Sequence, residues 1–88
     1  MSANLRAKRA LYRSRHRGTR ELDIVLGGFA ERFIHGFDDS ELDRFEALLD
    51  EPDPELYDWL LHGAAVPERH QGDLMNRLKA HAESVSKT

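Results

Sequence analysis

Apolar residues recur at intervals of three and four positions along most of the chain, the spacing that places them on one face of an α-helix. The clearest run begins at Leu22 and ends at Phe37. No segment alternates apolar and polar residues over the length of a strand. The pattern predicts an all-α protein, a compact bundle of five short helices joined by tight turns.

Capping residues predict where these helices begin and end. Asp38, with Glu41 three residues later, has the form of a capping box. Pro52 stops the third helix, because the residue before a proline avoids the helical conformation. Asp53-Pro54 then offers an N-cap and a proline at the first helical position. We expect helices over about residues 4–15, 19–35, 38–51, 53–63 and 67–84, with Gly36 and Gly63 ending the second and the fourth.

The first helix has a thin apolar face. Leu5, Leu11 and Tyr12 are expected to pack against the rest of the bundle. Between them lie basic residues, which the same helical spacing places on the outer side. The outward arginines are expected to be Arg6, Arg9 and Arg13.

The second helix contains the pair Gly27-Gly28, although each glycine in a helix interior costs about 1 kcal/mol relative to alanine. The apolar spacing continues across the pair, so we expect a close helix crossing here rather than a break. Trp59 lies on the apolar side of the fourth helix and is expected to be buried.

Charge is distributed very unevenly along the chain, which has 88 residues and a net charge of −3. Residues 1–20 hold seven of the thirteen Lys and Arg residues and no acid, a local charge of +7. Residues 21–88 hold the other six basic residues and all sixteen acids, a local charge of −10. The acids are densest between Asp38 and Asp58, where Arg44 is the one base.

This asymmetry suggests one domain in three parts: a basic N-terminal arm or helix at 1–16, a helical bundle at 17–83 and a frayed tail at 84–88. An arginine-rich, acid-free start is also typical of organellar targeting peptides. Cleavage of such a peptide would cut into Arg17-Gly18, at the head of the predicted bundle. We therefore favour a mature protein that begins at its first Met, in the bacterial cytoplasm.

Several kinds of chemistry are disfavoured by composition. The chain has no cysteine, which excludes disulfides and thiolate metal sites. Its apolar runs are far shorter than the ~18 residues of a membrane span, so we expect no membrane insertion. A bundle of this size leaves little room for a substrate cavity. No two of the five histidines are three or four residues apart, so no metal site is expected: His16, His35, His62, His70 and His81.

Two functional classes stay possible on residue types alone. A basic arm could bind nucleic acid or act as an antitoxin-like regulatory partner; that binding would depend on salt and on Arg6, Arg9 and Arg13. A small enzyme could instead use Glu21 or Glu46 as a base, but it would need a pocket. Glu46 could also fold toward the arginine-rich arm.

The segment between the basic and acidic parts is the strongest candidate for a recognition element. It reads Arg17-Gly18-Thr19-Arg20-Glu21-Leu22-Asp23, with a glycine that permits close approach of another surface. Arg17 and Glu21 are four residues apart. They could form an internal ion pair, which contributes little if exposed, or could be presented together to another macromolecule.

This segment and a second block resemble a known family. Arg17-Gly18-x-x-Glu21-Leu22-Asp23, followed by an apolar helix and by Asp53-Pro54-x-Leu56-Tyr57-x-Trp59-Leu60, resembles the succinate dehydrogenase assembly factors, the bacterial flavinylation factor and its mitochondrial counterpart. The similarity covers about residues 12–80. It implies a five-helix bundle, in agreement with the apolar spacing.

The resemblance implies a non-catalytic assembly factor. Such proteins bind the flavoprotein subunit of succinate dehydrogenase, and in bacteria also that of fumarate reductase, and promote covalent attachment of FAD to it. By analogy FAD belongs to the client and is not bound stably here; direct contact with FAD is left open. We expect a monomer that binds no nucleic acid. The client-binding residues implied by the motif and its neighbours are His16, Arg17, Gly18, Arg20, Glu21 and Asp23.

Overall fold

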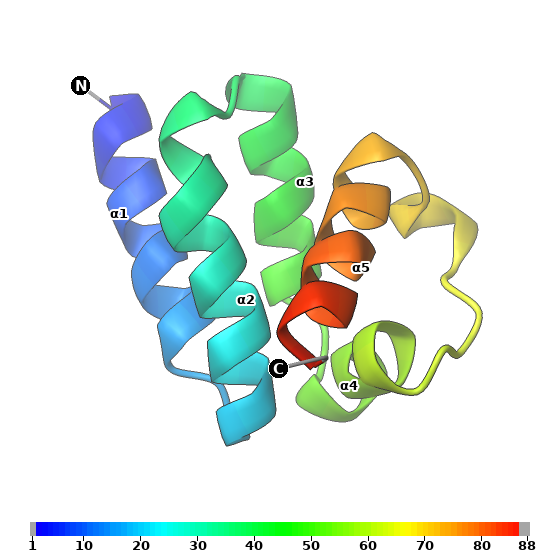
Figure 1. Cartoon of the computed structure of the whole chain (residues 1–88). Coiled ribbons are helices and arrows are strands. Elements are labelled where there is room, and N and C mark those ends of the chain that lie inside the picture. The colour runs from blue at the N-terminus through cyan, green and yellow to red at the C-terminus, as the bar shows by residue number, and fades with distance from the viewer. Residues whose placement is uncertain (1, 87–88) are drawn as a thin grey trace.

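The computed structural model describes residues 2–86 and shows five α-helices and no strand within them. Helices α1, α2 and α3 run alternately up and down, and α5 packs against α2, α3 and α4 (Figure 1). The predicted all-α, five-helix bundle is confirmed. The helices are α1 (Ser2–Arg15), α2 (Arg20–Phe33), α3 (Asp39–Leu49), α4 (Asp53–Leu61) and α5 (Asp73–Ser86), with short 3₁₀ turns η1 (Ile34–Gly36) and η2 (Glu68–His70).

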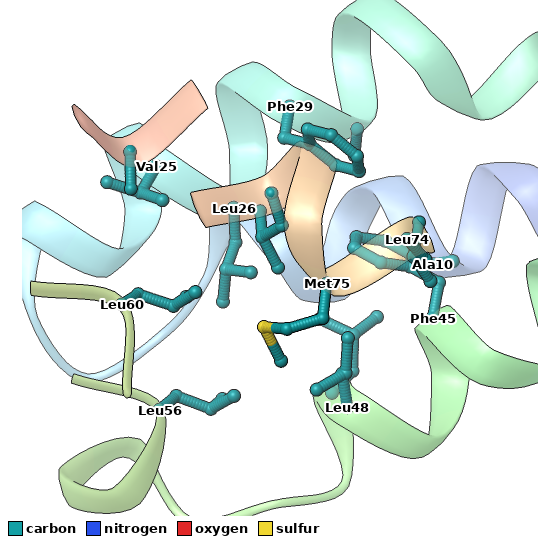
Figure 2. Close-up of a cluster of buried hydrophobic side chains, with 14 of the residues drawn as sticks. Ala10, Val25, Leu26, Phe29, Phe45, Leu48, Leu56, Leu60, Leu74 and Met75 are labelled. Atoms are coloured by element: carbon teal, nitrogen blue, oxygen red, sulfur yellow. The ribbon is translucent and has the colours of Figure 1, made fainter. Parts of the chain in front are cut away.

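Side chains from four helices form the centre of the core. Figure 2 shows Leu26 of α2, Leu48 of α3, Leu56 of α4 and Met75 of α5 converging on one another. Trp59 is buried at the edge of this cluster, as predicted. The apolar spacing of the sequence therefore found the residues that hold the bundle together in α2 to α5.

The prediction for the inner face of α1 is wrong for Leu5 and Tyr12, whereas Leu11 is half-buried and packs against the core as expected. Leu5 and Tyr12 are 49% and 63% exposed, and the residues that pack inward are Ala7, Ala10 and Ser14. Small side chains allow the α1 backbone to approach its neighbours closely. Ser14 is accommodated because its hydroxyl donates a hydrogen bond to the carbonyl of Leu11, at 2.6 Å.

Gly27 forms the other side of this close approach. A Cβ atom built on Gly27 would lie 3.0 Å from Cγ of Arg15 and 3.5 Å from the carbonyl oxygen of Ser14. A Cβ on Gly28 would lie 3.1 Å from Nε2 of His81, on α5. The expected close packing at the glycine pair is confirmed: α1 approaches one glycine and α5 the other.

The basic segment is a packed helix rather than a free arm. Arg6 is 2.6 Å from a carboxylate oxygen of Asp43 and 2.8 Å from one of Glu46, and Arg13 is 2.5 Å from Asp50. Asp43 and Glu46 belong to α3, and Asp50 is its C-cap residue. Arg9 and Arg13 are exposed as expected, whereas Arg6 is half-buried. Arg6 and Arg13 join the basic and acidic parts of the chain. Glu46 does turn toward the basic segment, as anticipated.

Helices α3 and α4 end about two residues earlier than predicted, and the boundaries of α2 and α5 differ for identifiable reasons. Helix α2 ends at Phe33, and Ile34–Gly36 continue as the tighter turn η1. Helix α5 begins at Asp73 rather than near Pro67, because Gly72 has a φ of +142°, which lies outside the helical region. At the other end α5 continues to Ser86, so residues 84–86 of the expected tail are helical, and residues 87 and 88 lie outside the described part.

Candidate functional site

The turn between α1 and α2, residues 16–19, carries most of the predicted recognition segment. Helix α2 begins after Thr19, whose hydroxyl accepts a hydrogen bond from the amide of Leu22 at 3.2 Å. Asp23, in the first turn of α2, reaches back and accepts from the amide of Arg17 at 2.6 Å. The first bond satisfies a backbone donor that a helix start leaves without a partner, and the second ties the turn to α2, so the turn has a defined shape.

The guanidinium of Arg17 points into the protein and binds the turn between α3 and α4. It donates to Oδ1 of Asp53 at 2.8 Å and to the carbonyls of Leu49 and Glu51 at 2.7 and 3.0 Å. The side chain of Arg17 is only 11% exposed. The carbonyls at the end of a helix lack intrahelical partners and attract a cation. Arg17 thus closes the C-terminus of α3 and ties it to the α1–α2 turn.

The possible ion pair between Arg17 and Glu21 does not form. Arg17 pairs with Asp53, 36 residues along the chain. Its guanidinium is also not presented outward beside Glu21, because three acceptors inside the bundle occupy it. The role that the geometry indicates for Arg17 is to position the turn.

Gly18 contacts the same carboxylate. Its amide donates to Oδ2 of Asp53 at 2.5 Å, and a Cβ atom on Gly18 would lie 2.6 Å from that oxygen. The sequence analysis expected Asp53 to cap α4 with its side chain. That expectation is wrong: α4 is preceded by Pro52 and has no side-chain cap, because the carboxylate of Asp53 is engaged by Arg17 and Gly18.

Asp53 is the functional residue that the sequence reasoning missed. It is the first residue of the second block of the family resemblance, and it joins that block to the first one through Arg17 and Gly18. Its position at the start of the second block could have indicated a role beyond its own helix. The sequence pattern Asp53-Pro54 also fits a helix N-cap, however, and that local role was predicted instead.

The other residues predicted to bind the client lie at the surface, apart from Asp23, which is half-buried. His16 is exposed, stacks on Tyr12 with ring centroids 3.9 Å apart, and lies 2.7 Å from the Tyr12 carbonyl. The side chains of Arg20 and Glu21 are exposed and have no hydrogen-bond or ion-pair partner within residues 2–86. One turn further along α2, Ile24 is 50% exposed. We call the exposed residues of this region the turn surface: His16, Gly18, Arg20, Glu21 and Ile24.

A second set of contacts supports the α3–α4 turn from the side of η2. The carboxylate of Glu51 lies 2.5 Å from Nε2 of His70 and 2.8 Å from Nη2 of Arg69. The hydrogen bond from His70, and then that from Arg69, lowers the pKa of Glu51 below its ordinary value. The backbone carbonyl of Glu51 also accepts a hydrogen bond from Arg17. The α3–α4 turn is therefore bound both by η2 and by the α1–α2 turn.

The low pKa of Glu51 predicts a loss of stability in acid. The folded state favours the ionised carboxylate, so this contribution is present above the ordinary glutamate pKa of about 4.3 and is lost as the pH falls through the lower folded value. We expect urea unfolding at pH 3–7 to show a decline below about pH 4 that is smaller in Glu51→Gln than in the unmodified chain. Equal declines in both proteins would contradict this assignment.

Comparison with known proteins identifies the family. A family model described as the flavinator of succinate dehydrogenase matches residues 8–82 of this chain. The chain belongs to this family. The matched segment contains Arg17, Gly18, Glu21 and Asp53, the residues that form the α1–α2 turn and its contact with α4.

Members of the flavinator family from distant organisms are similar to this chain. The FAD assembly factor SdhE of Acetobacter pasteurianus is 40% identical over 73 residues, which cover 83% of this chain and 67% of that protein. The mitochondrial succinate dehydrogenase assembly factor 2 of Dictyostelium discoideum is 36% identical, covering 88% and 55%, and that of Mycosarcoma maydis is 39% identical, covering 90% and 36%. The chain thus spans about half or less of these two mitochondrial relatives.

The family is one of assembly factors and not of catalytic enzymes. The two candidate bases are also unlike a catalytic pair, because Glu46 is bound by Arg6 while Glu21 is on the turn surface. Within residues 2–86 no group of three or more metal-binding side chains gathers, and none of the helices there has the length and apolar character to cross a membrane.

The ion pairs of α1 bear on the alternative hypothesis that the protein binds nucleic acid. Of the three arginines on which that hypothesis depended, Arg6 and Arg13 are paired with carboxylates of α3. Arg9 is exposed and has no such partner among the described residues. Most of the positive charge of α1 is thus neutralised within the bundle, which removes the free basic arm that the hypothesis required.

Proposed function

We propose that this protein binds the flavoprotein subunit of succinate dehydrogenase through the turn surface and promotes covalent attachment of FAD to that subunit. The observation that carries the proposal is the contrast between Glu21 and Arg17. Glu21 is exposed and lacks an internal partner, whereas Arg17, four residues earlier, is held by three hydrogen bonds inside the bundle. A rigid base under an unpaired carboxylate is suited to recognition of a partner.

The shape of the turn favours a backbone contact as well. Gly18 is exposed and has no side chain that would keep another backbone away. Arg20 and Ile24, also exposed, add a cation and an apolar side chain in the first turns of α2. An exposed apolar residue ringed by polar groups is typical of a small protein–protein contact.

The proposed mechanism is one of proximity. The turn surface holds the client in a geometry in which FAD and the acceptor residue of the client react, so the rate rises through orientation and not through donated catalytic groups. In this proposal FAD belongs to the client and is not bound stably by this protein. Action on the flavoprotein of fumarate reductase, a monomeric state and a bacterial cytoplasmic location are further parts of the proposal. The relatives include mitochondrial proteins of Dictyostelium discoideum and Mycosarcoma maydis and a protein of Acetobacter pasteurianus.

Covalent flavin on the client is the quantity that tests the proposal. The succinate dehydrogenase flavoprotein subunit is produced with no factor, with this protein or with a variant, and its in-gel flavin fluorescence is measured after denaturation. We expect the unmodified protein to raise the signal and Glu21→Ala to return it to the level without factor, because no other group replaces the unpaired carboxylate.

The matched control is Glu68→Ala, which removes an exposed glutamate of η2. We expect that variant to retain full activity. Equal signals with and without the unmodified protein would refute the assembly role. A loss shared by Glu21→Ala and Glu68→Ala would refute the assignment of Glu21 to the contact. Circular dichroism of each variant establishes that it is folded.

A further inference from the structure

A cavity of about 270 Å³ opens at the far end of α2 from the turn surface. It lies between the last turn of α2 and the middle of α5, two helices that pack side by side in the bundle (Figure 1). No residue of the Arg17–Asp23 or Asp53–Leu60 block lines this cavity, and the proposed function does not use it. The residues that line it are Arg32, Phe33, Arg77, Ala80, His81 and Ser84.

Two guanidinium groups are positioned here by one aromatic ring. The Cζ atom of Arg32 lies 5.2 Å from the ring centroid of Phe33, and the Cζ atom of Arg77 lies 4.9 Å from the same centroid. Arg77 is also within 5.9 Å of the Phe29 ring. Cation–π contacts of this kind favour a defined placement of the guanidinium. Both guanidinium groups therefore contact one ring and line the same cavity in the absence of any ligand.

The charge of these two arginines is only partly neutralised. Nη1 of Arg77 donates to a carboxylate oxygen of Glu41 at 3.1 Å, which leaves its other N–H groups free of any carboxylate in the described chain. Arg32 has no carboxylate or hydrogen-bond partner within residues 2–86. In a chain of net charge −3, most arginines of α1 find an acid, so an unneutralised arginine beside a second one is unusual here.

The environment of His81 is consistent with a positively charged cavity. Its Nε2 atom is buried without a hydrogen-bond partner, against Gly28 of α2. Burial, and then the charge of Arg32, lowers the pKa of His81 below its ordinary value. The imidazole is thus neutral at neutral pH, and the positive charge of the cavity comes from the arginines.

We propose that this cavity binds a compact oxyanion, a carboxylate or a phosphate group, between the guanidinium groups of Arg32 and Arg77. The guanidinium fork matches the spacing of oxygens in both groups and forms charge-assisted hydrogen bonds with them. The hydroxyl of Ser84 supplies one more donor at the rim, while Phe33 and Ala80 supply an apolar wall. The volume, at the lower end of the range for ligand sites, suits a small anionic group.

Titration of the full chain with two small anions tests this site directly. Inorganic phosphate and malonate are added separately at constant ionic strength, with chloride as the reference anion, and NMR shifts are followed for the Ser84 amide and the His81 ring. We expect saturable shifts at these two residues. Arg32→Gln should weaken the binding by about tenfold, which corresponds to the loss of charge-assisted hydrogen bonds from one guanidinium.

Two further variants separate a built site from general charge. Arg9→Gln removes an exposed arginine of α1 that also lacks a carboxylate partner in the described chain, and we expect it to leave the affinity unchanged. Arg77→Lys keeps the positive charge but removes the fork, and we expect it to weaken binding. Because none of these measurements needs the flavoprotein, their result is independent of the proposed assembly function.

Each outcome bears on the proposal. Saturation with phosphate alone identifies a phosphate site, saturation with malonate alone identifies a carboxylate site, and saturation with both identifies the shared oxyanion chemistry. Shifts that chloride reproduces, shifts that do not saturate, or an equal loss in Arg32→Gln and Arg9→Gln would overturn it.

Discussion

Replacing Arg17 by alanine is expected to lower the free energy of unfolding by about 2–4 kcal/mol, because the change leaves a partly buried carboxylate and two helix-terminal carbonyls without their donor. The carboxylate is that of Asp53, whose side chain is 24% exposed, and the carbonyls are those of Leu49 and Glu51. The expected loss of stability is large because three acceptors lose their hydrogen-bond donor together and because the Arg17 side chain is little exposed.

Urea unfolding followed by circular dichroism measures this loss. Arg9→Ala is the matched control, since it also removes an arginine, but one that is exposed and has no hydrogen-bond or ion-pair partner among the described residues; its effect should stay within about 0.5 kcal/mol. Arg17→Lys should fall between the two, because one ammonium cannot reproduce the directions of the guanidinium fork. A loss for Arg17→Ala no larger than that for Arg9→Ala would show that the turn does not depend on Arg17.

Replacing Gly18 by arginine is expected to abolish client flavinylation while the five helices survive. A Cβ atom at this position would lie 2.6 Å from Oδ2 of Asp53, so the carboxylate must move and release the Gly18 amide. Apart from its chain neighbours, only Asp53 has atoms within 4 Å of a Cβ built on the exposed Gly18, so no core side chain is displaced and α-helical content should be retained. The turn surface would be lost both by this shift and by the bulk of the new side chain beside Glu21.

Gly36→Ala is the control for this change. Nothing lies within 4 Å of a Cβ built on Gly36, which is at the end of η1, so the added methyl group meets open space. We expect that variant to support full flavin fluorescence on the client. Gly18→Arg should show helical circular dichroism and no flavin signal above the level without factor. An unfolded spectrum would instead make Gly18 a residue required for folding, and a full flavin signal would remove it from the contact.

These two predictions rest on one arrangement, in which a single carboxylate joins the two halves of the family resemblance. Asp53 binds the side chain of Arg17 and the amide of Gly18, and thereby fixes the α1–α2 turn on the N-terminus of α4. A contact surface that is rigid before binding loses less conformational entropy on association. Such rigidity is useful to a factor that acts by holding its client in one geometry.

Local sequence signals predicted much of the fold. The capping box of Asp38 and Glu41 is present with both of its hydrogen bonds, at 2.8 and 3.0 Å. These signals succeed because the residues that carry them interact within one turn of helix. The 3.6-residue spacing likewise found the inward residues of α2, where large apolar side chains leave no competing choice.

The inner face of α1 shows where such signals fail. Leu5 and Tyr12 are the more hydrophobic choice, yet Ala7, Ala10 and Ser14 are the buried residues. Which side of a basic helix faces inward depends on where its neighbours lie. Carboxylates of α3, such as Asp50 beside Arg13, and the closeness of the backbones at Gly27 together favour the small residues.

The sequence by itself determined the class of fold and the family, and it predicted a recognition segment around Gly18 and Glu21. The tertiary structure alone decided which of its side chains are available to a partner. The motif contains both Arg17 and Glu21 and does not distinguish their roles. In the structure Arg17 is bound by Asp53, which lies 36 residues further along the chain, while Glu21 has no partner in the described chain. The spacing of residues along a helix predicts which of them are neighbours within one turn. A contact between two loops forms only when the helices between them have packed, so the spacing does not predict it.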